Sequence, residues 1–266
     1  MLCQNNGGDC LILTAQNYFS PDANREYMSV SQFKAFKKCP AAALAELNGE
    51  YQREQTQALL VGSYVDAYFS DEMEQFIAEH PEIFKRDGTL KAEYEQADKI
   101  IARVQRDPMF MEYLNGQKQV IMTGEIQGVP FKIKVDALHD DKIVDLKVMR
   151  DFQPVYSEEM CARVPFWVAW GYDIQAACYQ EIVRQNTGKV LPFYLTAATK
   201  EKVTDYAIIH IAQSDLEFAL EMVKSEIVQF DAIKKGIIEP DRCEECAYCR
   251  ETKMLTEVIE SDSSLI

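Results

Sequence analysis

The segment from 119 to 148 most constrains the fold, because it has the pattern of three successive β-strands. Residues 129–138 place apolar side chains at odd positions up to 137 and lysines at 132 and 134, which is the two-residue period of a strand. Gln127-Gly128 is a hairpin signal, and residues 139–142 form a second turn. We therefore expect strands at 119–126, 129–138 and 143–148 in an antiparallel meander.

Helical patterns flank this meander on both sides. We expect helices at 29–38, 41–54, 58–69 and within 70–118, then helix 166–184, strand 191–198, strand 206–211 and helix 214–236. This order predicts a single α/β (α+β) domain over 27–253 with a helical N-terminal elaboration. We expect residues 1–26 to be a flexible lead-in and residues 254–266 an acidic tail.

Composition and charge narrow the function classes. The 266 residues are 47% hydrophobic, which excludes a disordered, collagen-like or coiled-coil protein as the main class. No apolar run is long enough to span a bilayer, and the N-terminus lacks a signal-peptide pattern, so we expect a soluble, intracellular protein. With 28 Lys+Arg against 43 Asp+Glu, the net charge of −15 argues against passive coating of DNA. It does not exclude a local basic groove or metal-mediated binding.

Two aspartates and a lysine in the meander carry the pattern of a metal site. Asp145 and Lys147 lie two apart, so both side chains leave the same face of their strand, and the turn brings Asp136 beside Asp145. Two adjacent carboxylates repel unless a cation lies between them, and Mg²⁺ or Mn²⁺ prefers carboxylate oxygens. A nearby lysine can then orient or deprotonate the attacking water. Alternatively, these residues are surface charges at strand ends.

A polar pair lies on the helix expected at 166–184. Gln175 and Tyr179 are four residues apart and therefore share one face of the helix. They can hold a phosphate or steady a metal site; alternatively they form a partly buried polar edge of the helix.

The combination of Asp136, Asp145-Leu-Lys147 and Gln175-x3-Tyr179 resembles the RecB-like type of PD-(D/E)XK nuclease. More widely, the chain resembles the phage-type exodeoxyribonuclease VIII family, which is PD-(D/E)XK-like. That resemblance covers roughly residues 27–253 and is carried by the blocks 28–34, 45–49, 59–69, 123–129 and 242–250. It implies a restriction-endonuclease-like core at 119–211, with a mixed central sheet flanked by helices.

The resemblance also implies roles for individual residues. Asp136, Asp145, Lys147, Gln175 and Tyr179 are the implied catalytic residues, with Mg²⁺ or Mn²⁺ as the cofactor. RecB-like nucleases usually place a metal-binding His in a G-x3-H segment, where this chain has Gly62-Ser-Tyr-Val-Asp66. Asp66 is therefore a third candidate ligand, because a carboxylate suits a hard ion; alternatively it is a buried capping residue. Glu125 is a candidate outer-shell carboxylate.

Cysteines form a second candidate site. The sequence has eight of them, and an intracellular protein keeps cysteines reduced. Cys243-x2-Cys246-x2-Cys249 predicts a thiolate cluster that binds Zn²⁺ or an iron–sulfur cluster, and Cys39 is the best candidate for a fourth ligand. This spacing resembles the iron–sulfur staple of some RecB-like helicase–nucleases and CRISPR-associated adaptation nucleases. We therefore expect a [4Fe–4S] cluster ahead of Zn²⁺, with free thiols as the third alternative.

The leading functional prediction is a metal-dependent DNA exonuclease. Lys132, Lys134 and Arg150 are candidates for offsetting the acidity at a DNA groove. The resemblance implies that the substrate is a double-stranded DNA end, that a single-strand annealing protein or recombinase is the partner, and that the chain forms a homo-oligomer. It also implies a phage or prophage protein in the cytoplasm of a bacterial host. The rival hypotheses are a non-catalytic interaction module with a nuclease fold and a redox-sensing iron–sulfur protein.

Overall fold

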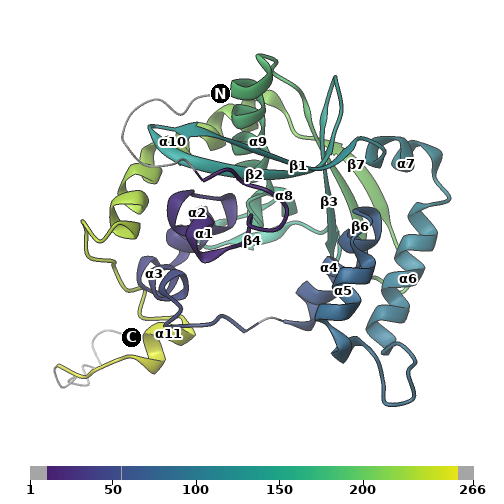
Figure 1. Ribbon diagram of the computed structural model, residues 1–266, viewed down its shortest axis with the longest axis horizontal. Helices are drawn as coiled ribbons and strands as arrows, with labels where there is room; N and C mark the ends of the chain where they lie inside the picture. Colours follow the sequence, from purple (N-terminus) through teal and green to yellow (C-terminus); the bar gives the residue numbers. More distant parts are fainter. Residues whose placement is uncertain (1–10, 55, 257–266) are drawn as a thin grey trace.

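The computed structural model describes residues 11–54 and 56–256, and a mixed five-stranded sheet lies at its centre (Figure 1). The strand order is β1-β2-β3-β6-β7, and only the β3–β6 pair is parallel. The bounds are β1 (Gln117–Ile126), β2 (Val129–Leu138), β3 (Ile143–Met149), β6 (Phe193–Thr199) and β7 (Tyr206–His210). The antiparallel meander and the predicted fold class are confirmed.

Helices cover both faces of the sheet. One hydrophobic cluster joins β1 and β2 to α2 (Val30–Lys38), α9 (Tyr172–Thr187) and α10 (Gln213–Lys234). A second joins β3 to α4 (Gln57–Phe69), α6 (Ala92–Val104) and α7 (Pro108–Leu114). The remaining elements are α1 (Pro21–Glu26), α3 (Pro40–Asn48), α5 (Met73–Glu79), η1 (Pro81–Ile83), β4 (Val155–Ser157), β5 (Ala162–Val164), α8 (Phe166–Ala169) and α11 (Ala247–Glu251).

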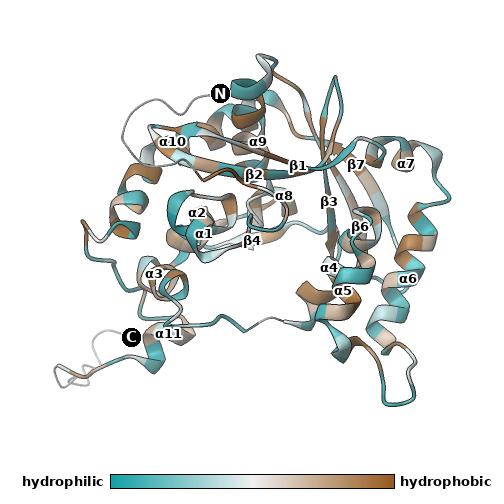
Figure 2. Ribbon diagram, in the orientation of Figure 1, coloured by the Kyte–Doolittle hydropathy of each residue, from teal (hydrophilic) through white to brown (hydrophobic). Residues whose placement is uncertain are grey.

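Sequence periodicity explains which faces are buried. On β3, Ile143 packs into the first cluster, whereas Val144 and Leu146 pack into the second, as a period of two requires. On α6, Tyr94, Ala97, Ile101 and the other buried residues recur every three or four positions. Figure 2 shows the corresponding mixture of hydrophobic and hydrophilic residues along α6.

Glycines in the left-handed backbone region shorten two expected helices. The helix expected at 41–54 ends at Asn48, because Gly49 has a φ of 77° and caps α3. The helix expected at 166–184 is divided into α8 and α9 by Gly171, whose φ is 63°. This break makes Tyr172 the first residue of α9, and its side chain then lies at the candidate site.

The N-terminal segment is wrongly predicted as a flexible lead-in for the part that the structure describes. Ser20 caps α1 by accepting a hydrogen bond from the N–H of Ala23, and Ala23 is fully buried. Tyr18 is buried as well. Cys3, Cys10 and most of the acidic tail lie outside the described residues.

Among the described helices, none combines the length and hydrophobicity that crossing a lipid bilayer requires.

Candidate active site

The structure brings the two aspartates of the meander and the lysine together. The Lys147 Nζ lies 2.5 Å from Asp145 Oδ2, and both side chains leave the same face of β3. Asp136 reaches across from β2, and its Oδ2 accepts a hydrogen bond of 2.9 Å from the backbone N–H of Leu146. Three groups predicted from spacing therefore converge where β2 lies beside β3.

The strand ladder stops at these carboxylates. The β2–β3 ladder consists of Ala137 with Val144 and Leu138 with Ile143. One further pair in this register would set Asp136 opposite Asp145, but the backbones do not pair there. On the other side of β2, the β1 ladder skips Gln119, whose φ of 50° interrupts the strand opposite Asp136. The local sheet is therefore open at the position where the carboxylates meet.

Helix α9 supplies the polar pair, and its two members have different partners. Gln175 Nε2 donates a hydrogen bond of 2.6 Å to Asp145 Oδ1. The Tyr179 hydroxyl donates to the backbone carbonyl of Lys134, at 3.0 Å. Of the two roles predicted for the pair, the position of Gln175 fits steadying a metal site, because Gln175 orients the carboxylate of Asp145, whereas Tyr179 fixes α9 against β2.

Asp66 on α4 lies in the same electrostatic environment. It lines a cavity of about 850 Å³ that Asp136 and Lys147 also line. Burial, and then the charge of Asp136, raise the pKa of Asp66 to about 7. The carboxylates of Asp66, Asp136 and Asp145 gather around the ammonium of Lys147, and Lys134 is a second ammonium that acts on Asp66. This surplus of oxygen donors and negative charge fits a divalent cation.

Lys147 is charged despite its burial. Burial alone would lower its pKa, but Asp145 and Asp136 together raise the pKa well above its usual value. Asp145 is only 1% exposed. Its Oδ2 forms an ion pair with the Lys147 ammonium but has no partner in good hydrogen-bond geometry. Asp145 and Lys147 therefore form a buried ion pair, in which Gln175 supplies the hydrogen bond to the other carboxylate oxygen, Oδ1.

Basic and aromatic residues that the sequence pattern did not single out complete the site. Lys34 on α2 donates a hydrogen bond of 2.6 Å to the backbone carbonyl of Trp170. Two ammoniums lie near the ring of Tyr172, with Lys34 Nζ 5.5 Å and Lys147 Nζ 5.7 Å from its centroid. Lys38 is one turn beyond Lys34 on α2 and lines the large cavity. The four-residue spacing of Lys34 and Lys38, which places both on one face of a helix, is the sequence pattern that could have identified them.

Two of the predicted basic residues have other roles. Lys132 is 1% exposed, and its Nζ donates to the carbonyl of Tyr18 and to Asn24 Oδ1, so it anchors the N-terminal segment. Lys134 forms an ion pair of 3.7 Å with Glu72. Arg150 is exposed, pairs with Asp151 at 2.6 Å and lines the large cavity. Lys134 also lines a second cavity of about 470 Å³ with Gln175 and Tyr179, so both Lys134 and Arg150 lie beside the candidate site.

Glu125 is not an outer-shell carboxylate of this site. It is exposed, and it pairs in the β1–β2 ladder with Pro130 beside the hairpin. Six residues of strand separate Pro130 from Asp136, which is roughly 20 Å of β2. The turn predicted at 127–128 already implies this separation, because it places Glu125 beside the turn and Asp136 near the other end of the hairpin.

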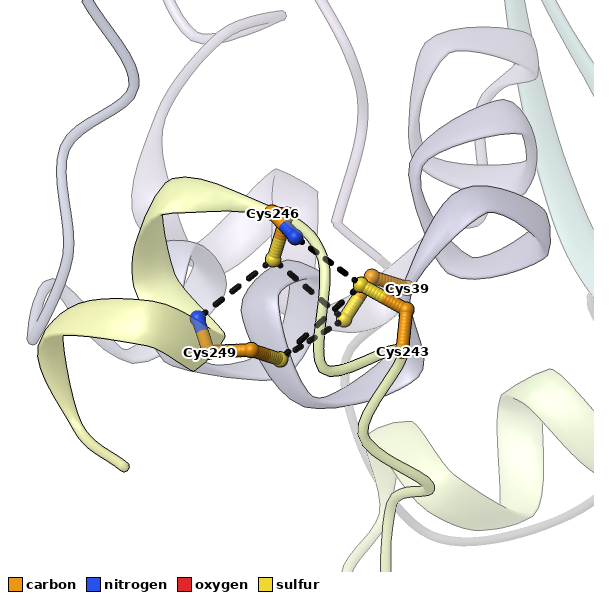
Figure 3. Close-up of side chains that lie close together, drawn as sticks. All are labelled: Cys39, Cys243, Cys246 and Cys249. Carbon is orange, nitrogen blue, oxygen red and sulfur yellow. Dashed lines mark hydrogen bonds between the residues drawn. The ribbon is translucent and has the colours of Figure 1, made fainter. Parts of the chain in front are cut away.

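The predicted cysteine cluster is assembled (Figure 3). Cys39 lies at the junction of α2 and α3, and Cys243, Cys246 and Cys249 come from the segment around α11. Their sulfur atoms all lie within 4.8 Å of one another. Outside this group, Cys178 is buried and Cys161 is exposed.

Comparisons with known proteins agree with this geometry. The model of a family described as a PDDEXK-like domain of unknown function matches residues 29–252. Among solved structures, the chain is similar to the crystal structure of a "putative exonuclease" from Eubacterium rectale, with 46% identity and a TM-score of 0.91. That match covers 94% of this chain and 97% of the other. A comparison with curated proteins finds no match. The predicted resemblance to PD-(D/E)XK nucleases is confirmed.

Proposed function

Since the chain belongs to the family of PDDEXK-like domains, we propose that it is a metal-dependent deoxyribonuclease that hydrolyses phosphodiesters from double-stranded DNA ends. One observation carries this proposal: Asp136 and Lys147 line a cavity where the sheet ladder is interrupted, and the buried Asp145 pairs with Lys147 directly beside it. A purely structural ion pair would not require a second carboxylate beside it, nor a third on α4.

The carboxylates are the metal ligands in this proposal. Asp136 and Asp145, joined by Asp66, would hold Mg²⁺ or Mn²⁺, which supplies Lewis-acid polarisation of the scissile phosphate. Gln175 holds the Asp145 carboxylate in one orientation through its hydrogen bond to Oδ1. The carboxylate therefore needs little reorganisation when the substrate binds.

Lys147 acts as a fixed positive charge near the reacting phosphate. Its amine has no hydrogen-bond acceptor role while it is protonated, so it donates to the water that attacks or to a phosphate oxygen. The negative charge that develops on the phosphate is stabilised by this ammonium in a site that is largely shielded from solvent. Of the two actions predicted for it, we therefore favour orientation of water over its deprotonation.

Local basic residues explain how an acidic protein would bind DNA. Lys38, Arg150 and Lys200 line the large cavity together with the carboxylates, and Lys34 lines a second cavity of about 470 Å³ with Gln175 and Tyr179. Phosphates contacted by these residues would be neutralised locally, although the net charge of the chain is −15.

The finer parts of the proposal rest on the family resemblance. The substrate would be a linear duplex end, and the single strand that remains would pass to an annealing protein or recombinase. Digestion along DNA also favours a homo-oligomer that encloses its substrate. These activities belong to DNA recombination, and we propose a phage or prophage role in a bacterial cytoplasm.

A comparison of linear and covalently closed duplexes tests the function. We expect the purified protein to digest the linear form with Mg²⁺, to leave the closed circle intact, and to lose activity with chelator. Asp136→Asn should remove the activity, whereas Asp140→Asn, in the neighbouring exposed turn, should not. Cleavage of the closed circle would contradict exonuclease action. Equal digestion by wild type and Asp136→Asn would instead favour the non-catalytic interaction module.

A further inference from the structure

The spacing of the four cysteine sulfurs defines how many metal ions they can hold. Cys39 Sγ lies 3.6 Å from Cys249 Sγ and 3.8 Å from Cys246 Sγ, and Cys243 Sγ lies 3.9 Å from Cys249 Sγ. These contacts link all four residues into one compact group (Figure 3). The sulfurs come from two segments of chain more than 200 residues apart in sequence, so the group depends on the fold.

These distances match a single tetrahedral ion. Four thiolates around one Zn²⁺, each about 2.3 Å from the metal, are separated from one another by about 3.8 Å. In a [4Fe–4S] cluster each thiolate binds a different iron, so the thiolate sulfurs are roughly 6 Å apart. The iron–sulfur cluster expected from the resemblance does not fit this arrangement. We infer that Cys39, Cys243, Cys246 and Cys249 hold one Zn²⁺ ion.

The backbone around the cysteines supports the same conclusion. The N–H of Cys246 donates to Cys243 Sγ at 3.3 Å, and the N–H of Cys249 donates to Cys246 Sγ at 3.4 Å. Such outer donors orient thiolate ligands and disperse the negative charge of a four-thiolate site. Cys39 and Cys249 are buried, at 2% and 0% exposure, whereas the other two are partly accessible. Four protein thiolates would leave no open coordination position on the ion, as in structural zinc sites.

The position of the ion gives it a mechanical role near the candidate active site. Cys39 ends α2 and begins α3, and next to it the N–H of Ala41 donates to the carbonyl of Asp241 at 3.0 Å. The ion would thus tie the end of α2 to the C-terminal segment. Lys34 and Lys38, on that same helix, line the two cavities. The zinc site would hold these basic residues in place without contacting DNA.

Metal content is the direct test. The full chain should be expressed in medium containing both iron and zinc and purified without oxygen, so that an oxidised cluster cannot be lost and replaced. We expect one zinc per chain and no acid-labile sulfide. Replacement by Co²⁺ should give the intense visible absorption of a tetrahedral thiolate site. Iron with labile sulfide, one iron without sulfide, or no bound metal would each overturn the inference.

Variants separate a real site from adventitious zinc. Cys246→Ser should reduce the zinc content well below one per chain, whereas Cys161→Ser, at an exposed cysteine outside the group, should keep one. Retention of a full zinc by Cys246→Ser would contradict the assignment. If that variant does not fold, chelation of the wild type supplies the readout: zinc removal should lower the melting temperature, and zinc should restore it. An unchanged melting temperature would overturn the anchoring role.

Discussion

The carboxylate of Asp136 on β2 accepts a hydrogen bond from the backbone N–H of Leu146 on β3, at 2.9 Å. A side chain thereby takes the place that a strand backbone would occupy, immediately after the last paired residues of the two strands. The N–H remains satisfied while the strands stop pairing. The sheet can therefore present two opposed carboxylates without leaving the N–H of Leu146 unpaired.

Loss of the ammonium at Lys147 should slow catalysis, and it should also lower stability, because it leaves Asp145 buried without its ion-pair partner. We expect Lys147→Met to reduce the rate of DNA hydrolysis by about 10²–10³-fold, the effect of removing one positioned donor from a site of developing charge. Lys147→Arg should retain part of this activity. Single-turnover digestion of an end-labelled duplex measures it, with Lys142→Met on the neighbouring turn as control. A Lys147→Met variant with wild-type rate would exclude the assigned role.

Asp66 should be replaceable by the residue usual in RecB-like nucleases. If this position is a metal ligand, Asp66→His should remain active, because imidazole also binds divalent ions. Asp66→Ala should lose about 10²-fold or more, since metal ions supply several kcal/mol of transition-state stabilisation. When the rate is titrated with Mn²⁺, Asp66→Ala should bind the ion more weakly and so need more Mn²⁺ for half-maximal rate. The exposed Glu74→Gln should behave as wild type; equal activity of His and Ala variants would argue for a capping role.

Gln175 and Tyr179 should separate into a positioning residue and a stabilising residue. Gln175→Leu should raise the Mn²⁺ concentration required for half-maximal activity by about 10-fold or more, as outer-shell changes do, because Asp145 loses its orienting donor. Tyr179→Phe should instead cost about 1 kcal/mol of unfolding free energy through the lost hydrogen bond to Lys134. Its metal dependence should stay unchanged. Urea denaturation and metal titration on both variants distinguish these outcomes.

DNA binding should depend on pH through Lys34. Burial, and then the neighbouring charge of Lys147, lower the pKa of Lys34 to about 8, while Asp145 and Asp173 oppose this. Its positive charge is therefore present below about pH 8 and lost as the pH rises. Between pH 7 and 9 the slope of log affinity against log salt should become less steep by about 0.9. This change corresponds to the loss of one phosphate contact.

Substitutions at this position provide the controls. Lys34→Arg should bind DNA with a salt slope that no longer changes between pH 7 and 9, because arginine stays charged. Lys34→Met should have the smaller slope at both pH values. Lys99→Met, at an exposed position on α6, should titrate like the wild type. Fluorescence anisotropy measures these slopes, with every substitution made in a catalytically inactive variant so that the DNA is not digested. If Lys34→Arg keeps the pH response, that response belongs to another group.

Lys132 should contribute to the stability of the fold and not to DNA binding. Lys132→Met removes the donor to the Tyr18 carbonyl and to Asn24 Oδ1, which leaves two acceptors without their partner. We expect the unfolding free energy to fall by about 2–4 kcal/mol, measured by urea denaturation. The salt slope of DNA binding should not change. A reduced slope with unaltered stability would restore the groove role predicted from sequence.

Local sequence predicted the meander and the identity of the central residues. Strict alternation at 129–137 and the two turn signals placed Asp136 and Asp145 on neighbouring strands, since period and turn chemistry act over a few residues. The cysteine spacing likewise predicted a thiolate cluster. The helix breaks at Gly49 and Gly171 were missed because a left-handed glycine is evident only from the backbone.

The sequence by itself determined the strand pattern, the polar residues at the site and the four thiols, because each is encoded by side-chain type and near-neighbour spacing. Tertiary structure alone decided that Lys132 anchors the N-terminal segment and that α2 brings Lys34 to Tyr172. It also set the sulfur spacing that distinguishes one ion from a cluster. These facts depend on contacts between segments distant in the chain, which no local period specifies.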